Sequence, residues 1–339
     1  MRPADLLWAG FGGQDARDVA WLPEAPGGVI LFARNLDPDP GAGPARCRAL
    51  LEGLQARWGA ELPLAIAIDQ EGGAVSRLRP WVGETPSFRR IWERGGAAAC
   101  EAWGRLWGEG LAMLGFNVDF APVADLWDGN PGTGMGDRCA STDPVEVASA
   151  VGAFLHGLES TGVRGCLKHF PGLGGTTLDS HKGLPELADQ GRITANARAF
   201  QMLSNEDRLV MVAHLKTPAT GGLPASLHRG SVAENPWRVA GRFLPDDLEM
   251  GGVADWDWEA RVRLSLEAGN EWLLVCQSEA GVGACFEAAA RLPEALWKPA
   301  VARSRAMRAN LPKRGVGALT PTAWADWVRR VQEAASRVS

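Results

Sequence analysis

The stretch Lys168-His169-Phe170-Pro171-Gly172-Leu173-Gly174, with the run that precedes it, decides the fold of this chain. Residues 162–167 form a short apolar run between Gly162 and the glycine-rich turn, which is typical of a buried strand. Polar side chains therefore follow the carboxyl end of a predicted strand, where α/β folds place their binding and catalytic groups. Lys168 and His169 can donate hydrogen bonds to hydroxyl groups or to an anion.

The loop beyond this stretch carries Asp179 and His181, two residues apart. A carboxylate beside an imidazole fixes the tautomer and favours the protonated ring, which makes a proton donor near neutral pH. The alternative is a loop in which Asp179 caps a turn and His181 has no chemical role. Three of the five histidines, His169, His181 and His214, follow predicted strands or lie in adjoining loops, which favours the chemical interpretation.

Short apolar runs alternate with longer helical segments along the chain. We expect strands at residues 28–32, 64–68, 118–123, 162–167, 209–213, 243–244 and 272–276. We expect helices at residues 44–58, 87–114 (with a break near Gly95), 144–160, 256–268, 281–290 and 296–310. This alternation is typical of a parallel sheet with crossover helices, although the sequence does not reveal an eighth strand.

Polar residues recur directly after the predicted strands: Asp69, Asp125, His169, His214 and Asp246. A doubly wound sheet would concentrate its site at one switch point, whereas a barrel collects side chains from many strand ends. We therefore expect an α/β fold with a single (β/α)8 TIM-type barrel over residues 1–314, with an irregular or missing strand. Residues 315–339, which include an amphipathic helix from 322 to 338, are expected to form a C-terminal helical extension on the barrel exterior.

The segment from Lys168 to Pro185 resembles the signature of bacterial β-N-acetylhexosaminidases of glycoside hydrolase family 3, the NagZ type. That signature is Lys-His-Phe-Pro-Gly-His-Gly, a short spacer, and Asp-Ser-His. The chain matches it except at Leu173, where the family has a second histidine. The resemblance covers roughly residues 28–276 and has recognisable marks at six separate places.

The resemblance implies the catalytic roles. Pro245-Asp246-Asp247-Leu248-Glu249-Met250 is similar to the family pattern Ser-Asp-Asp-Leu-x-Met, in which the first Asp attacks the anomeric carbon. Asp246 would be that nucleophile, with Pro245 in place of the family's serine. His181 would be the acid/base, oriented by Asp179. The alternative is that Asp246 and Asp247 only cap the helix that follows.

The resemblance also implies the sugar-binding residues. Asp69, before Gly72 and Gly73, matches the segment that binds the outer hydroxyls of the terminal sugar, although Ala74 stands where the family usually has Arg. Lys168 and His169 match a sugar-binding pair. A helix-capping acidic cluster is the alternative for Asp69.

Two further matches complete the predicted substrate-binding set. Arg138 follows Asn130-Pro131 as in the family, although Cys139-Ala140 replaces Ser-Phe; the alternative is an Arg–Asp pair on a surface loop. His214 matches another histidine of the family at a strand end, and the alternative is a buried histidine bonded to the backbone.

The family's activity is thus the expected function: a retaining β-N-acetylhexosaminidase that releases terminal β-linked N-acetylglucosamine, from peptidoglycan (muropeptide) fragments. A family 3 β-glucosidase remains an alternative. So does a phosphorylase, because an imidazole does not repel phosphate as a carboxylate would. The alternative outside enzymes is a degenerate barrel that binds sugar without turning it over.

Composition limits the remaining possibilities. A net charge of −5 argues against a nucleic-acid partner, and the apolar runs are too short to span a membrane. Six cysteines without paired spacing indicate reduced thiols; we predict no metal and no cofactor. Residues 1–14 lack the apolar region of a secretory signal, so we expect a cytoplasmic monomer whose partner is a small carbohydrate. Of the fifteen tryptophans most should lie in the core, and one or two can stack on a sugar ring.

Overall fold

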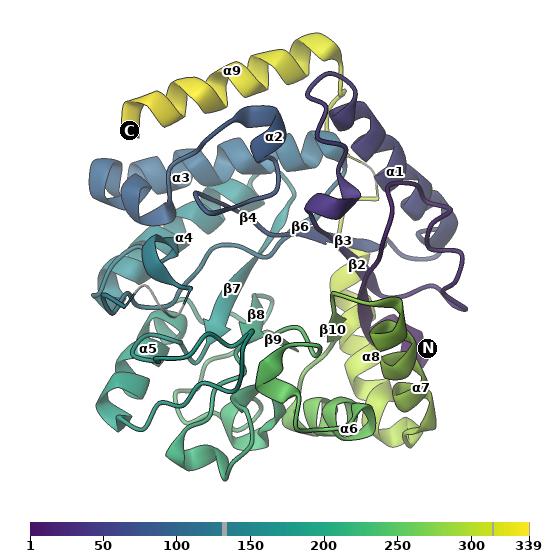
Figure 1. The fold of residues 1–339 in the computed structure, drawn as a ribbon, viewed down its shortest axis with the longest axis vertical. Coiled ribbons are helices and arrows are strands. Elements are labelled where there is room, and N and C mark those ends of the chain that lie inside the picture. Colours follow the sequence, from purple (N-terminus) through teal and green to yellow (C-terminus); the bar gives the residue numbers. More distant parts are fainter. Residues whose placement is uncertain (131–133, 314, 339) are drawn as a thin grey trace.

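Eight parallel strands form one sheet at the centre of the molecule, and helices surround it (Figure 1). The structure is a computed structural model that describes residues 1–130, 134–313 and 315–338. The strands lie in the order β10-β1-β2-β3-β6-β7-β8-β9. Their bounds are β1 Leu7–Gly10, β2 Gly28–Leu31, β3 Ala65–Ile68, β6 Val118–Asp119, β7 Arg164–Phe170, β8 Leu209–Val212, β9 Arg242–Pro245 and β10 Leu273–Val275. The predicted (β/α)8 barrel is confirmed.

The barrel is nearly closed. β1 pairs in parallel with both β10 and β2, which joins the two ends of the chain's strand series. β9 and β10 share no ladder within the described residues. Two backbone hydrogen bonds bridge them instead: Glu271 N donates to Phe243 O at 2.7 Å, and Leu248 N donates to Leu274 O at 2.9 Å.

The expectation of a missing strand was wrong, because the eighth strand is the N-terminal β1. Its four residues, Leu-Trp-Ala-Gly, are too few to show a strand period, and only their pairing with β10 and β2 makes them a strand. The weak run at 243–244 is confirmed as part of β9. The run at 118–123 yields only the two residues of β6, because Pro122 has no N–H to donate; Val123 then forms an isolated bridge with Lys168.

The helices that the sequence predicts begin and end close to their expected bounds: α1 Gly43–Trp58, α3 Phe88–Leu114, α4 Pro144–Glu159, α6 Trp258–Ala268, α7 Glu279–Arg291, α8 Glu294–Ala309 and α9 Pro321–Val338. Two further helices, α2 Arg79–Val82 and α5 Gln190–Met202, were not predicted. The predicted break in α3 is present at Gly96, where φ is 56° and ψ is −151°. Asp143 caps α4 by accepting from Val145 N and Glu146 N.

The interior of the barrel is filled, so a ligand can bind only at its mouth. Alternate residues of the strands point inward, among them Trp8, Ile30 and Trp272, and Trp8 stacks on Phe120 with ring centroids 5.3 Å apart. The opposite faces of the same strands pack against the helices in a second, larger core. A small hairpin, β4 Gln70–Gly72 and β5 Val75–Ser76, lies beyond β3.

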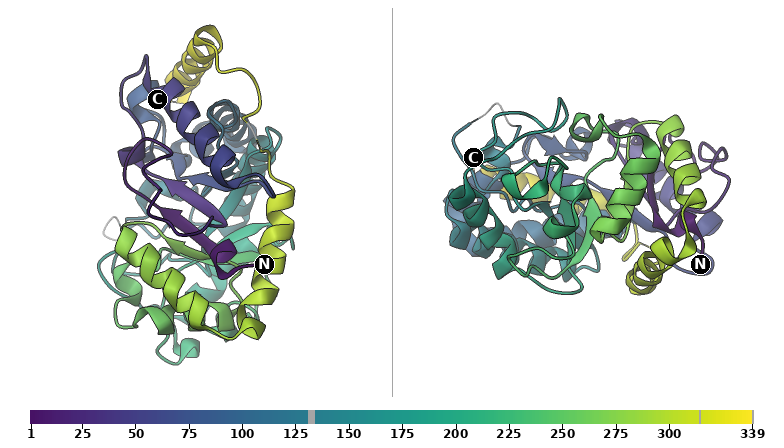
Figure 2. Two further views of the ribbon diagram at one scale, coloured as in Figure 1. Left: turned by 90° about the vertical axis from the view of Figure 1, so that its right-hand side faces the viewer. Right: turned by 90° about the horizontal axis from the view of Figure 1, so that it is seen from below.

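The C-terminal helix α9 lies on the outside, along α3, at one end of the molecule (Figures 1 and 2). Its buried residues include Trp324, Trp327 and Val331, and Trp327 Nε1 donates to Leu106 O of α3 at 2.7 Å. This agrees with the expected exterior position of the helix. The predicted domain boundary falls at residue 314, outside the described residues, and the division into two domains stays a prediction.

Across the parts of the chain that are described, none of the helices has the length and apolar character that a bilayer span requires.

Candidate active site

A cavity of about 330 Å³ opens at the carboxyl ends of the strands. This volume lies at the lower end of the range for small-molecule sites, roughly 300–1,000 Å³. Seven of the eight predicted site residues line it: Asp69, Arg138, Lys168, His169, Asp179, His181 and Asp246. They come from the ends of β3, β7 and β9 and from the loops after β6 and β7. His214 does not belong to the lining.

Two carboxylates and two cations alternate on one side of this cavity. Lys168 Nζ lies 2.8 Å from Asp69 Oδ1 and 2.6 Å from Glu71 Oε1. Arg138 binds both oxygens of Glu71, with Nε at 2.8 Å from Oε2 and Nη2 at 2.9 Å from Oε1. We call these four residues the floor cluster.

All members of the floor cluster that are deeply buried keep their charge. Burial by itself raises the pKa of Glu71, but Arg138 and Lys168 outweigh it and hold that pKa well below its ordinary value. Burial likewise lowers the pKa of Lys168, whereas Asp69 and Glu71 raise it above the ordinary value. The cavity therefore presents fixed carboxylate acceptors and fixed ammonium and guanidinium donors, which is what sugar hydroxyls bind.

The local sequence explains why Asp69 and Glu71 act together. They stand two residues apart in extended backbone, so their side chains share one face, while Gln70 between them turns away. Gln70 Nε2 donates to Ser76 Oγ at 3.0 Å, and its backbone N donates to buried Asp119 Oδ1 at 2.9 Å. Burial raises the pKa of Asp119 well above its ordinary value.

His169 is oriented by a fully buried carboxylate. Asp125 Oδ2 accepts from His169 N at 3.0 Å and lies 2.7 Å from Nδ1, and Asp125 Oδ1 accepts from Leu173 N at 2.7 Å. A carboxylate at Nδ1 fixes the proton of the neutral ring on that nitrogen. Nε2 has no partner among the described residues and remains free for a ligand.

Asp246 follows β9 and is held by its own chain, because Asp247 N donates to Asp246 Oδ1 at 2.8 Å. Burial raises the pKa of Asp246, but the nearby His169, the hydrogen bond from Asp247 N and Lys168 outweigh it and lower that pKa below the ordinary value. Asp246 is therefore an ionised carboxylate in the cavity wall, which a nucleophile must be.

His214 supports the segment that carries Asp246 and makes no contact with the cavity. Its Nε2 donates to Asp247 O at 2.9 Å, so its Nδ1 accepts from Ser226 Oγ at 2.7 Å. Burial lowers the pKa of His214, which agrees with this neutral form. Since both nitrogens are engaged, the geometry favours a positioning role over the substrate contact predicted from the sequence.

Asp179 and His181 form the pair that their spacing predicted. Asp179 Oδ1 accepts from His181 N at 2.9 Å and lies 2.8 Å from His181 Nδ1. Burial raises the pKa of Asp179, but these bonds outweigh it and lower that pKa. Gly252 N donates to Ser180 O at 3.1 Å, which ties the loop of the pair to the chain just beyond Asp246. His181 itself is 71% exposed at the cavity rim.

The chain matches the Glycosyl hydrolase family 3 N terminal domain over residues 17–309. The chain belongs to glycosyl hydrolase family 3. It is 32% identical to the β-hexosaminidase of Pseudomonas aeruginosa over 285 residues, which cover 81% of this chain and 82% of that protein. These matches make this family 3 chain a glycoside hydrolase of the β-N-acetylhexosaminidase type.

Solved structures are similar as well. NagZ of Neisseria gonorrhoeae in complex with N-trifluoroacetyl-D-glucosamine has a TM-score of 0.78 and 26% identity, with 99% of each chain covered. LpqI of Mycobacterium tuberculosis has a TM-score of 0.78 and 29% identity, covering 91% of this chain and 93% of that one.

Several residues of this family 3 site were missed in the sequence. Glu71 stands in the same run as Asp69, and its spacing of two was the signal that the pair shares a face. Asp125 and Asp247 were visible as carboxylates after strands, but only packing shows that they orient His169 and the turn after Asp246. Arg77 also lines the cavity, with Nη2 at 3.8 Å from Asp69 Oδ2. Pro131 of the predicted Asn130-Pro131 mark lies outside the described residues.

Within the described residues, no group of three or more His, Cys, Asp or Glu side chains is arranged to hold a metal ion. The six cysteines are free and buried, and burial raises the pKa of several of their thiols, for example that of Cys100 to about 12. Such thiols are not nucleophiles.

Proposed function

We propose that the chain is a retaining β-N-acetylhexosaminidase that releases terminal β-linked N-acetylglucosamine from peptidoglycan (muropeptide) fragments. The observation that carries the proposal is that an ionised carboxylate, Asp246, and a hydrogen-bonded Asp179–His181 pair line one sugar-sized cavity. The names of the relatives support it, since they are β-hexosaminidases, and one similar structure holds an N-acylated glucosamine.

In the first step, a carboxylate oxygen of Asp246 forms a bond to the anomeric carbon as the bond to the leaving oxygen breaks. Protonated His181 gives its proton to that leaving oxygen, while Asp179 holds the ring through Nδ1. In the second step, neutral His181 takes a proton from water, the water oxygen bonds to the anomeric carbon, and Asp246 is released. Two displacements on opposite faces retain the configuration.

The floor cluster is proposed to bind the outer hydroxyls of the terminal sugar. Asp69 accepts hydrogen bonds from sugar hydroxyls, Arg138 and Lys168 donate hydrogen bonds to hydroxyl oxygens, and His169 Nε2 offers a further hydrogen-bond site at a fixed position. Buried groups that are already paired in this way lose little freedom when the sugar binds. His214 is proposed to position Asp246 by holding the Asp247 carbonyl.

A second activity remains open, because the acid/base is an imidazole and not a carboxylate. Phosphate in place of water would release N-acetylglucosamine 1-phosphate, with no proton to remove in the second step. We propose hydrolysis as the main reaction, in a cytoplasmic monomer that acts on a small carbohydrate.

The test is turnover of an aryl β-N-acetylglucosaminide and an aryl β-glucoside, with and without phosphate, by the native chain and by Asp246→Ala. We expect preference for the N-acetylglucosaminide, no need for phosphate, and a kcat lowered by about 10³-fold or more in the variant. Glucoside preference would identify a β-glucosidase, sugar phosphate as product would identify a phosphorylase, and no turnover at all would leave a sugar-binding barrel. Release of N-acetylglucosamine from a purified muropeptide, followed by mass spectrometry, tests the natural substrate.

A further inference from the structure

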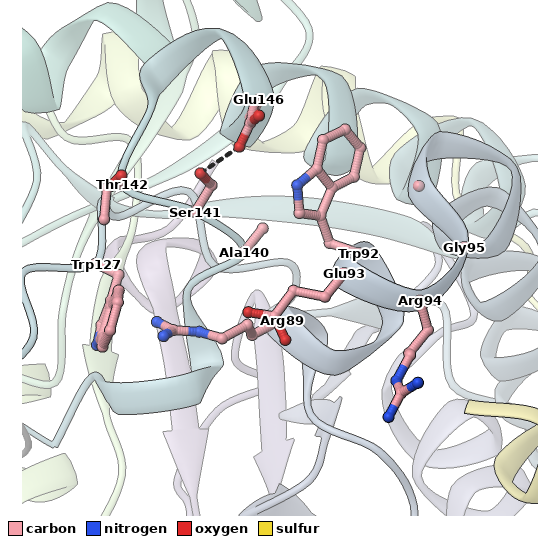
Figure 3. Close-up of a pocket in the computed structure, with 11 residues that line it drawn as sticks. Arg89, Trp92, Glu93, Arg94, Gly95, Trp127, Ala140, Ser141, Thr142 and Glu146 are labelled. Carbon is pink, nitrogen blue, oxygen red and sulfur yellow. Dashed lines mark hydrogen bonds between the residues drawn. The ribbon is translucent and has the colours of Figure 1, made fainter. Parts of the chain in front are cut away.

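A second hollow of about 570 Å³ lies where α3 breaks and faces the start of α4 (Figure 3). We call it the α3–α4 hollow. Trp92, Arg89, Glu93 and Arg94 line it from α3, and Ser141 and Thr142 line it from the segment before α4. The first part of α3 ends at the break at Gly96, and this break lies beside the hollow.

Several polar groups of the α3–α4 hollow are left without partners in the described residues. Arg89 lies over the Trp127 ring, with Cζ 3.5 Å from the ring centroid, and its buried Nε has no hydrogen-bond partner. No hydrogen bond or ion pair is found for the side chains of Glu93 and Arg94, both exposed. The exposed side chains of Glu93 and Arg94 are therefore available to a ligand.

The chemistry of the lining selects a neutral, polyhydroxylated ligand. Two arginines and two glutamates, Arg89, Arg94, Glu93 and Glu146, balance in charge, so neither an anion nor a cation is favoured. Hydroxyl groups can donate hydrogen bonds to the carboxylates and accept them from the guanidinium groups. Trp92 supplies an apolar face for the C–H side of a pyranose, while Trp127 is already covered by Arg89.

The hollow and the catalytic cavity are neighbours along one loop. Gly134, Met135 and Arg138 line the cavity, and residues 140–142 of the same loop line the hollow. Arg89 Nη2 donates to Gly136 O at 3.2 Å, in the middle of this loop. Gly134 also lies beside the Asp179 carboxylate, so the loop is on the side of the cavity where the leaving group is protonated.

We propose that the α3–α4 hollow is a saccharide subsite that holds a distal sugar of the leaving group, with Trp92 as its stacking platform. The inference rests on the proposed function, because the loop's side is the leaving-group side only if His181 is the acid. It makes the enzyme selective for longer glycan fragments over a single glycosyl unit on a small aglycone.

The test is a series of N-acetylchitooligosaccharides of two to five units beside an aryl β-N-acetylglucosaminide, with KM measured for each. The native chain should show a KM about tenfold lower once the chain is long enough to reach the hollow. Trp92→Ala should abolish this lowering of KM for the longer chains and leave the KM of the aryl substrate unchanged. Trp58→Ala is the matched control, since Trp58 is another half-buried tryptophan, at the end of α1 and outside the lining.

Glu93→Gln serves as a second variant in case Trp92→Ala fails to fold, because Glu93 is exposed and unpaired; it should lose part of the same gain. Equal KM for all chain lengths in the native protein, or the same gain in native and Trp92→Ala protein, would overturn the proposal while aryl turnover still upheld the proposed function. If no substrate is turned over, calorimetric titration of the pentamer into the native chain and Trp92→Ala decides: equal affinities reject the subsite, and a loss of about tenfold in the variant supports it.

Discussion

The pKa values of two adjacent carboxyl groups, Asp246 and Asp247, shift in opposite directions because the two groups have different neighbours. Burial raises the pKa of Asp246, but the nearby His169, the hydrogen bond from Asp247 N and Lys168 outweigh it and lower that pKa. Burial dominates at Asp247 and, with Glu249 and Asp246 nearby, raises its pKa from 3.8 to about 6. Asp247 accepts from Cys276 N and Glu249 N at 3.0 Å, so its function is to hold the turn that presents Asp246.

Asp247→Asn should therefore change how stability depends on pH. Below about pH 4 Asp247 is protonated in both folded and unfolded chains; between about pH 4 and pH 6 only the folded chain keeps the proton, so this group makes stability fall as pH rises. Above pH 6 the penalty is complete at about 3 kcal/mol. Asn keeps the Oδ1 acceptor and removes the titration.

The measurement is urea unfolding at pH 4, 5 and 7. The free energy of unfolding of the variant minus that of the native chain should increase by about 2.5 kcal/mol from pH 4 to pH 7. Asp255→Asn, at an exposed carboxylate, is the control. A difference that does not vary with pH would contradict the assignment.

His181→Gln should have an effect that depends on the leaving group. If His181 protonates the departing oxygen, poor leaving groups such as alkyl alcohols lose about 10²–10⁴-fold in glycosylation rate. A dinitrophenolate leaves without a proton and should lose much less. Rates for a series of aryl and alkyl N-acetylglucosaminides measure this, with Lys182→Ala beside it as the control; equal losses across the series would exclude the acid role.

At the scale of elements, the break in α3 depends on one residue. Gly96 adopts φ 56° with ψ −151°, a conformation that only glycine visits readily. Gly96→Ala should cost about 1–3 kcal/mol of stability. Gly283 in α7 has no heavy atom within 4 Å of an added Cβ, so Gly283→Ala should stabilise the protein by about 0.5–1 kcal/mol.

Thermal and urea unfolding of both variants measure the contrast. Because the two changes add the same methyl group, opposite signs isolate the backbone conformation as the cause. A neutral Gly96→Ala would mean that α3 continues through the break at little cost.

Strands and helices were predicted where local patterns are sufficient. The runs that became β3 and β8 are fully buried and apolar, and Asp143 and Gly269 mark helix ends by their chemistry. β1 could not be found locally, because its identity depends on partners that lie about 20 and 265 residues away along the chain. The same reason applies in the site: Asp179 and His181 pair within three residues, whereas the bridging of Lys168 to Glu71 is a tertiary contact.

At the scale of the whole molecule, α9 secures the outer face of α3 and not the site. Trp327 packs against Trp107 and Trp324, with ring centroids 6.3 and 4.6 Å apart, and fills the space beside Gly110. Trp327→Ala should cost about 3–5 kcal/mol of stability. The kcat of the folded variant should equal that of the native chain, because no residue of α9 lines the catalytic cavity.

Unfolding by urea and kcat at low temperature check the two parts of this prediction, and Val328→Ala, a half-buried neighbour, serves as the control. If Trp327→Ala lowered kcat as much as Asp246→Ala does, the helix and the site would be coupled and the prediction would be wrong.

The alternation of Asp69, Lys168, Glu71 and Arg138 has a consequence for kinetics in solution. Opposite charges held side by side cancel beyond a few ångströms, so these four residues add little long-range field to act on the dipoles of an uncharged glycoside approaching the barrel. Added salt therefore has no long-range attraction to screen as the substrate approaches. The specificity constant for a neutral aryl N-acetylglucosaminide should stay level from dilute buffer to about 0.5 M sodium chloride, where the Debye length has shrunk to a few ångströms.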